Sequence, residues 1–158
     1  KLRYPPTGTP YIMLLQLIVG SGIISLTIVV TAIFLIAAIR ILNHVGPWLS
    51  MPPSPYKIPV TLVAATLWLL GAFTASVWIW ASAFVLLDLF DAFEPALYFS
   101  IVSFTTLGFG DITLPVDWRL LSGICAANGL LLFGLGAAFL VEVFTRLHQA
   151  QAGEEAQD

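Results

Sequence analysis

The residues best suited to chemistry in this chain form one loop, Thr105-Thr106-Leu107-Gly108-Phe109-Gly110-Asp111, set between two strongly apolar segments. Glycines at alternate positions allow backbone φ values that other residues avoid, so that successive carbonyls can be turned toward one axis. The Thr106 hydroxyl can add an oxygen at one end of this row. Such an oxygen-lined strand suits a partly dehydrated alkali cation, because carbonyl oxygens can replace the water shell of the ion. The loop is therefore a candidate cation site, and the alternative is a glycine-rich turn between two membrane helices.

No other group of residues in the sequence points to chemistry. We find no nucleophile with a base and no metal-ligand constellation, so we expect neither an enzyme nor a cofactor. Cys125 is the single cysteine and lies in an apolar segment, which excludes an intrachain disulfide and a cysteine metal cluster. The net charge of -3 comes largely from Glu154, Glu155 and Asp158. Without a basic patch, nucleic acid is not an expected partner.

The elements that position the loop belong to a membrane protein. Hydrophobic residues make up 59% of the 158-residue chain, charged residues make up 9%, and the mean hydropathy is +0.96. These values lie outside the range of soluble globular proteins. Three apolar segments, residues 11–42, 60–90 and 118–147, exceed the roughly 20 residues that a helix needs to span a bilayer. The sequence therefore predicts an all-α integral membrane protein with three transmembrane helices.

Two shorter segments complete the expected fold. Residues 45–59 contain one glycine and five prolines, which favours a non-helical connector at the membrane surface. Residues 95–105 are too short to span and lead directly into the loop, which is the pattern of a re-entrant half-helix. The C-terminal end of this half-helix would point into the membrane, where the negative end of the helix dipole favours a cation. Because non-helical backbone survives there only inside protein or beside water, the loop must lie at a subunit interface or in a pore.

At the loop, the sequence resembles the tetrameric potassium channels, whose filter reads Thr-Val-Gly-Tyr-Gly-Asp where this chain has Thr106-Leu107-Gly108-Phe109-Gly110-Asp111. The resemblance implies that the backbone of Thr106, Leu107, Gly108, Phe109 and Gly110 forms a filter for K+ as the permeant ion. Thr105 would close the pore helix, and Asp111 would lie at the outer mouth. The resemblance covers residues 60–148 and assigns an outer helix (60–90), a pore helix (95–105), a filter (106–110) and an inner helix (118–147). Because the pore element occurs once, a ring of four loops implies a homotetramer.

The inner helix carries a second group of matches. Counting on from the filter without a gap, Gly129 falls at the hinge glycine of simple bacterial channels of this family, and Arg119 and Phe133 are also similar. The same count assigns a largely apolar pore-facing side, formed by Leu130, Phe133, Ala137, Ala138, Val141 and Glu142. Such a side permits a cavity that is gated by dewetting. Two alternatives stay open for Glu142: a ring of four carboxylates at the cytoplasmic mouth, or an i, i+4 salt bridge to Arg146.

The support of the filter departs from the family pattern at two aromatic positions. In the family, the filter tyrosine bonds to aromatic residues of the pore helix, whereas here Phe109 has no hydroxyl and Phe99 has no polar edge. Loss of both partners of a buried hydrogen bond can be nearly neutral, whereas loss of one leaves a polar group without a partner. We therefore expect apolar packing among Phe99, Phe104 and Phe109 behind the filter.

The aspartate that follows the filter also needs a partner different from the usual one. Val102 stands where some relatives place a carboxylate that pairs with this aspartate. We therefore expect the Tyr98 hydroxyl to bond to Asp111. Leu107 in place of the usual valine keeps the carbonyl and changes only the packing behind it. Strict and weak selectivity for K+ both stay open.

We expect the protein to lie in the plasma membrane, and the resemblance implies its orientation there. It places the N-terminus and the filter outside, and the connector and the C-terminus in the cytoplasm. Charge does not decide the orientation, because each side carries three basic residues: Arg40, Lys57 and Arg146 inside, and Lys1, Arg3 and Arg119 outside. Residues 1–59, an N-terminal transmembrane helix with its proline-rich connector, and the polar tail 149–158 lie outside the resemblance. For the first helix we expect contact with membrane lipid or with another helix, and its partner is unknown.

We predict a homotetrameric, potassium-selective channel that conducts K+ passively through backbone carbonyls. The sequence has no arginine ladder, so gating through a voltage-sensing helix is not expected, while lipid, pH, tension or a partner stay open as stimuli. The alternatives are a weakly selective cation channel and a non-conducting membrane scaffold that retains the fold.

Overall fold

The computed structural model describes residues 10–49 and 56–155 of the chain. Within these ranges it contains no strand, one 3₁₀ turn and four α-helices: α1 (Pro10–Leu49), α2 (Lys57–Leu86), α3 (Phe93–Phe104), η1 (Val116–Trp118) and α4 (Arg119–Glu155). Three segments of the described residues are long and apolar enough to cross a membrane: Pro10–His44, Lys57–Leu86 and Val116–Gln149. The prediction of an all-α membrane protein with three long helices is confirmed.

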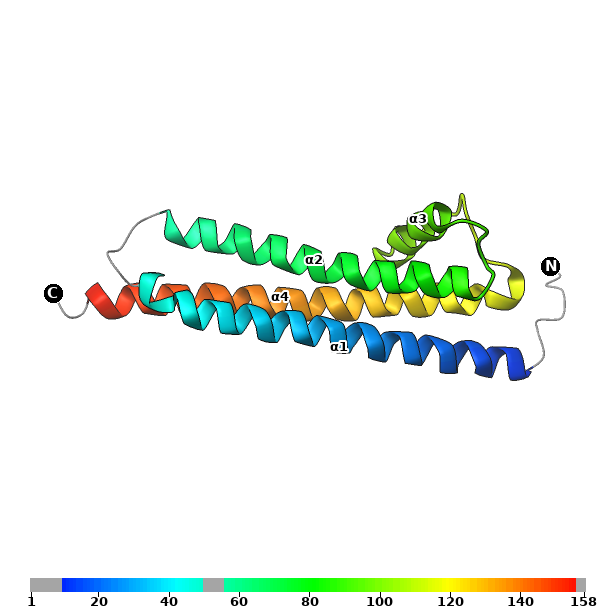
Figure 1. The fold of residues 1–158 in the computed structure, drawn as a ribbon, viewed down its shortest axis with the longest axis horizontal. Coiled ribbons are helices and arrows are strands. Elements are labelled where there is room, and N and C mark those ends of the chain that lie inside the picture. Colours follow the sequence, from blue (N-terminus) through cyan, green and yellow to red (C-terminus); the bar gives the residue numbers. More distant parts are fainter. Residues whose placement is uncertain (1–9, 50–55, 156–158) are drawn as a thin grey trace, which may run out of the picture.

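The three long helices lie side by side, and the short helix α3 lies against one end of them (Figure 1). Both α1 and α3 pack against α2 and α4. In Figure 1 the loop that follows α3 lies near the start of α4, whereas α1 ends and α2 begins at the opposite end of the molecule. We call these two ends the loop end and the junction end.

Helix α2 ends four residues earlier than the predicted end at residue 90, because a capping turn stops it. Asp88 adopts the left-handed conformation with φ of +53°. The N–H of Leu89 donates to the carbonyl of Phe84 at 3.0 Å, and the N–H of Asp88 donates to the carbonyl of Val85 at 3.0 Å. This pair of bonds is the Schellman arrangement, which satisfies the last carbonyls of a helix. Aspartate tolerates the left-handed conformation better than most residues other than glycine.

The prolines interrupt the helices less than the sequence predicts. Pro47 lies inside the last turn of α1, where it removes only one helix hydrogen bond, so the helix continues to Leu49. Pro59 and Pro95 are the third residues of α2 and α3, where the backbone N–H of a helix has no partner in any case. The predicted connector is therefore shorter at both ends, and its central residues 50–55 lie outside the described residues.

Helix α4 also extends beyond its predicted end at residue 147. It continues to Glu155, so most of the predicted polar tail is helical, and residues 156–158 lie outside the described residues. Residues 1–9, before α1, lie outside the described residues as well. At 37 residues, α4 is about 55 Å long, and it therefore projects beyond a hydrocarbon core of about 30 Å.

Aromatic side chains hold α3 against the long helices. Trp80 and Phe84 of α2 are fully buried, as is Phe104 of α3. The ring of Phe99 meets the rings of Phe84 and Phe90 at centroid distances of 5.3 and 5.4 Å, in the range of favourable aromatic pairs. Packing within one chain is therefore enough to fix the position of α3.

Candidate functional site

The backbone of the loop alternates in handedness. Thr106, Gly108 and Gly110 have φ of +62°, +55° and +76°, whereas Leu107 and Phe109 between them have negative φ. Residues of alternating handedness direct their N–H groups to one side, and their carbonyls therefore point to the other. A β-branched residue at positive φ is a rare conformation that is disfavoured by roughly 1–3 kcal/mol. Thr106 is therefore held in a strained conformation, which is part of the alternation that turns the carbonyls to one side.

Two backbone hydrogen bonds tie the loop to the end of α3. The N–H of Thr106 donates to the carbonyl of Ser103 at 2.9 Å, and the N–H of Gly108 donates to the carbonyl of Val102 at 3.2 Å. The hydroxyl of Thr105 donates to the carbonyl of Ile101 at 2.7 Å and caps the last turn. The N–H side of the loop thus faces α3, so the carbonyl side faces away from it.

The C-terminal end of α3 lies deep along α4. A Cβ built on Gly129 of α4 would lie 2.8 Å from the carbonyl carbon of Phe104 and closer still to its oxygen. Gly129 follows Arg119, the first residue of α4, by ten residues, or about 15 Å of helix. This is half the thickness of the hydrocarbon core, which is about 30 Å. At such a depth, the non-helical backbone of the loop must face protein or line water.

The far end of the loop is held by a side-chain hydrogen bond. The Tyr98 hydroxyl donates to Asp111 Oδ2 at 2.7 Å, which is the contact that the sequence leads us to expect. This hydrogen bond holds the pKa of Asp111 below its ordinary value, because it stabilises the carboxylate. The same bond and the nearby negative charge raise the pKa of Tyr98. Both ends of the loop are therefore attached to α3.

Comparison with known proteins agrees with this geometry. A family model described as "Ion channel" matches residues 62–146, which is more than half of the chain and includes α3 and the loop. The chain belongs to the pore-loop potassium channel family. Over 68 residues it is 31% identical to the potassium voltage-gated channel protein Shal of Drosophila melanogaster, and the aligned part is 42% of this chain. The chain spans only 12% of the length of that relative. No solved structure gives a significant match.

The packing that we expected among Phe99, Phe104 and Phe109 is not formed within one chain. Phe99 and Phe104 are buried, but Phe109 is 66% exposed. The ring of Phe104 meets the ring of Phe133 at 5.8 Å, and that of Phe99 meets rings on the α2 side. The reason is geometric: Phe109 lies on the exposed loop, on the side turned away from the core of its own chain.

The inner-helix positions that the count from the loop predicts to face a pore lie on the open side of α4. Phe133 is 38% exposed, and its ring also packs against Phe73 at 4.8 Å and against Phe104. The others are exposed in one chain: Leu130, Ala137, Ala138, Val141 and Glu142. Gly129 has a packing role in addition to the predicted hinge, since the backbone of Phe104 occupies the space that a side chain would need.

Glu142 forms an ion pair with Arg146. The distance from Arg146 Nε to Glu142 Oε1 is 2.6 Å, and both side chains are about half exposed. This is the i, i+4 pair that was one of the two alternatives from the sequence. Exposed pairs of this kind stabilise a helix by only about 0.3–0.5 kcal/mol, so they can rearrange easily. The carboxylate ring stays a hypothesis about the assembled channel.

Sequence reasoning missed a set of polar contacts between α1 and the start of the inner helix. Gln16 is buried, and its Nε2 donates to the carbonyl of Asp117 at 2.6 Å. Its Oε1 accepts a hydrogen bond from the N–H of Leu121 at 3.3 Å. The first N–H groups of a helix have no partner inside the helix, and the Gln16 amide supplies one. The two helices also pack closely at Gly20 of α1, where an added Cβ would lie 2.8 Å from the side chain of Ile124 on α4.

A second buried contact joins the same helices next to the end of α3. Asn128 Nδ2 donates to Thr27 Oγ1 at 2.8 Å, and this hydroxyl donates in turn to the carbonyl of Ile24 at 2.8 Å. Both side chains are completely buried. Asn128 is adjacent to Gly129, which contacts Phe104. These contacts therefore connect α1 through α4 to Phe104, the residue that precedes the loop. The sequence did contain a signal for this contact, because Thr27 and Asn128 are polar residues within apolar segments.

Proposed function

We propose that four copies of this chain form a channel that conducts K+ passively, with the carbonyls of residues 106–110 as ion ligands. The alternating backbone of the loop carries the proposal. Its left-handed residues at Thr106, Gly108 and Gly110 direct the carbonyls away from α3, which gives one chain a single row of oxygen ligands. Rows of this kind can replace the hydration shell of K+ when several surround one axis. K+ is the permeant ion and not a resident cofactor.

The exposure of the loop supports assembly around such an axis. In a single chain, every residue from Thr106 to Asp111 is exposed, as are Leu130 and Val141 on the open side of α4. Peptide groups at mid-membrane depth are strongly disfavoured in contact with lipid. Neighbouring copies and water in a shared pore would remove them from lipid. Members of this family generally assemble as tetramers, and the expected homotetramer is part of the proposal.

The electrostatics of α3 favour a cation at the axis. A helix carries about half a negative charge at its C-terminal end, so four converging ends would supply roughly two negative charges. The end of α3 has no basic residue in its last turn to cancel this charge. Four Asp111 carboxylates at the mouth would raise the local cation concentration. In the proposed orientation the loop end faces outside and the junction end faces the cytoplasm, in the plasma membrane.

A potassium flux assay on purified protein in liposomes tests the proposal. The wild-type chain should release K+ down its gradient, whereas Gly108→Ala should not, because alanine at φ of +55° is disfavoured by roughly 1–2 kcal/mol in every subunit. Gly22→Ala is the matched control, since an added Cβ there meets no atom within 4 Å. Absence of flux through the wild-type protein would favour the non-conducting scaffold, and equal flux through Gly108→Ala would exclude the carbonyl filter.

Selectivity needs a separate measurement, because Leu107 and Phe109 differ from the usual filter residues. Reversal potentials in mixed K+ and Na+ should follow the K+ gradient. A reversal potential near zero under the same conditions would assign the protein to weakly selective cation channels. A reporter fused to the C-terminus should be accessible only from the cytoplasm, and labelling from outside would reverse the orientation.

A further inference from the structure

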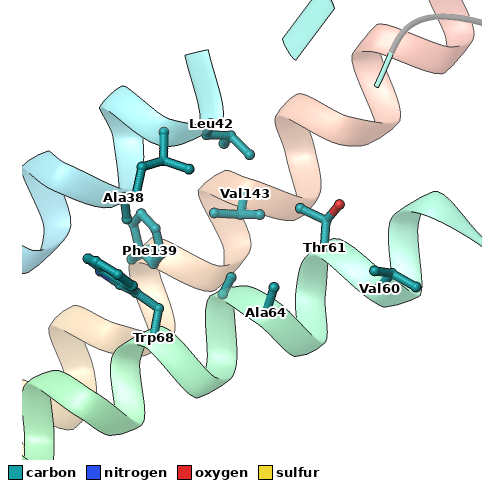
Figure 2. Close-up of a pocket in the computed structure, with 10 residues that line it drawn as sticks. Ala38, Leu42, Val60, Thr61, Ala64, Trp68, Phe139 and Val143 are labelled. Carbon is teal, nitrogen blue, oxygen red and sulfur yellow. The ribbon is translucent and has the colours of Figure 1, made fainter. Parts of the chain in front are cut away.

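An apolar cavity of about 290 Å³ lies at the junction end between α1, α2 and α4. Figure 2 shows side chains from all three helices around it, including Leu42 of α1, Trp68 of α2 and Phe139 of α4. The polar side chains among the described lining residues are already bonded: Thr61 Oγ1 donates to the carbonyl of Lys57 at 2.9 Å, and Trp68 Nε1 donates to the carbonyl of Phe34 at 2.9 Å. The occupant of this cavity must therefore be apolar.

A second hollow adjoins this cavity on the surface of α1. It measures about 480 Å³ and is lined by Ile33, Ile36, Ala37, Arg40 and Ile41. Ile41 also lines the first cavity, so the two spaces adjoin at this side chain. Among the described residues that line the two spaces, Arg40 is the one that carries a charge. Two apolar spaces thus meet beside a single exposed guanidinium.

The depth of both spaces matches the boundary between acyl chains and headgroups. Phe139 follows Arg119 by 20 residues, which is about 30 Å of helix and equals the thickness of the hydrocarbon core. Ile41 lines the same cavity as Phe139. Ile41 and the adjacent Arg40 therefore lie near the level of lipid phosphates on the junction side. From there, the second hollow extends along α1 to Ile33, about 10 Å toward the middle of the membrane.

We propose that an anionic glycerophospholipid binds astride Ile41, with one acyl chain in the cavity, the other along the second hollow, and its phosphate on Arg40. Three observations support this occupant: two adjoining apolar spaces for two chains, the bonded state of the polar groups in the cavity, and a cation at phosphate level. Arginine binds phosphate oxygens through two parallel hydrogen bonds, which makes it well suited to this contact. The site requires only that the chain is embedded in a membrane, and it is independent of ion conduction.

Quenching of Trp68 fluorescence by brominated lipids tests the site directly, because this indole lines the cavity. The full chain is reconstituted in phosphatidylcholine bilayers, and brominated phosphatidylglycerol or brominated phosphatidylcholine is titrated in. The Trp68 contribution is taken as the difference from Trp68→Phe. We expect phosphatidylglycerol to reach half-quenching at about a five-fold lower mole fraction, which corresponds to the roughly 1 kcal/mol that one cation contributes near an anionic headgroup.

Two variants separate the parts of the proposed site. Arg40→Gln should abolish the difference between the two lipids, whereas Arg146→Gln, the same charge change at an ion-paired residue, should preserve it. Ala64→Phe should fill the cavity and weaken quenching by both lipids, with the exposed Ala32→Phe as control. Equal half-quenching by the two lipids in the wild-type protein, or a difference that persists in Arg40→Gln, would overturn the proposal even if Ala64→Phe fails to fold.

Discussion

Replacement of Gly129 by alanine tests whether this residue is a packing contact or only a hinge. In an open helix the change would stabilise the protein, because alanine is favoured over glycine by about 1 kcal/mol. Here the new Cβ would lie 2.8 Å from the carbonyl carbon of Phe104 and 3.2 Å from its Cα. Main-chain atoms cannot rotate away as a side chain can, so α3 must shift. Overpacking costs about 1–3 kcal/mol, and a main-chain clash belongs at the upper end. We therefore expect the free energy of unfolding to fall by about 2 kcal/mol per chain.

The expected functional result follows from the position of Phe104 directly before the loop. A shift of α3 moves Thr105 and Thr106, so K+ flux should fall together with the thermal stability of the purified protein. Gly22→Ala, with no atom near the new Cβ, should leave flux unchanged and should not lower stability. A purely hinge role predicts the opposite combination, in which Gly129→Ala alters gating but keeps or raises stability. Stability equal to or above that of the wild-type protein would refute the packing role.

Two further predictions concern the hydrogen bonds that support the site. Thr27→Val should destabilise the protein by about 0.6–1.7 kcal/mol, between the average and the largest value for interhelical hydrogen bonds in membranes. Asn128→Leu added to Thr27→Val should recover part of this loss, because no amide is left unpaired. Additive losses in the double mutant would contradict this. Tyr98→Phe should raise the pKa of Asp111 toward 3.8, since the hydrogen bond from Tyr98 lowers this pKa in the wild-type protein. In the wild-type protein, the stabilisation by this bond is lost as the pH falls through the lowered pKa of Asp111. Acid titration of the flux from the loop side should therefore shift to a higher midpoint, and an unchanged midpoint would show that this bond does not support conduction.

The short helix and the handedness of the glycines could be predicted from the sequence because they depend on local properties. An apolar segment too short to span, followed by alternate glycines, predicts a half-helix with left-handed residues, and Gly108 and Gly110 have positive φ. The left-handed Thr106 could not be predicted, since β-branched residues avoid this region unless the surrounding structure holds them there. Family membership followed from the same residues together with the matches along the inner helix.

The contacts of α1 could be predicted only in part. Gln16 and Thr27 are eleven residues apart, about three helical turns, so they lie on one side of α1 and indicate a polar helix face. Their partners could not be identified, because Asn128 and the start of α4 meet them only in the folded bundle. The expected packing of Phe109 is not formed within one chain, where this side chain is 66% exposed. Residue types alone do not show which side of a loop faces the core of its own chain.

The polar contacts between α1 and α4 also limit how far the segment that matches the family is modular. The family match begins at residue 62, yet the amide of Gln16 completes the first turn of α4 and Thr27 satisfies Asn128 within the membrane. A chimaera built from residues 62–146 alone would leave the Asn128 amide and the N–H of Leu121 without these partners. The first helix thus supplies partners that the matched segment lacks, and a transplant of that segment would have to include α1 or replace Asn128 by an apolar residue.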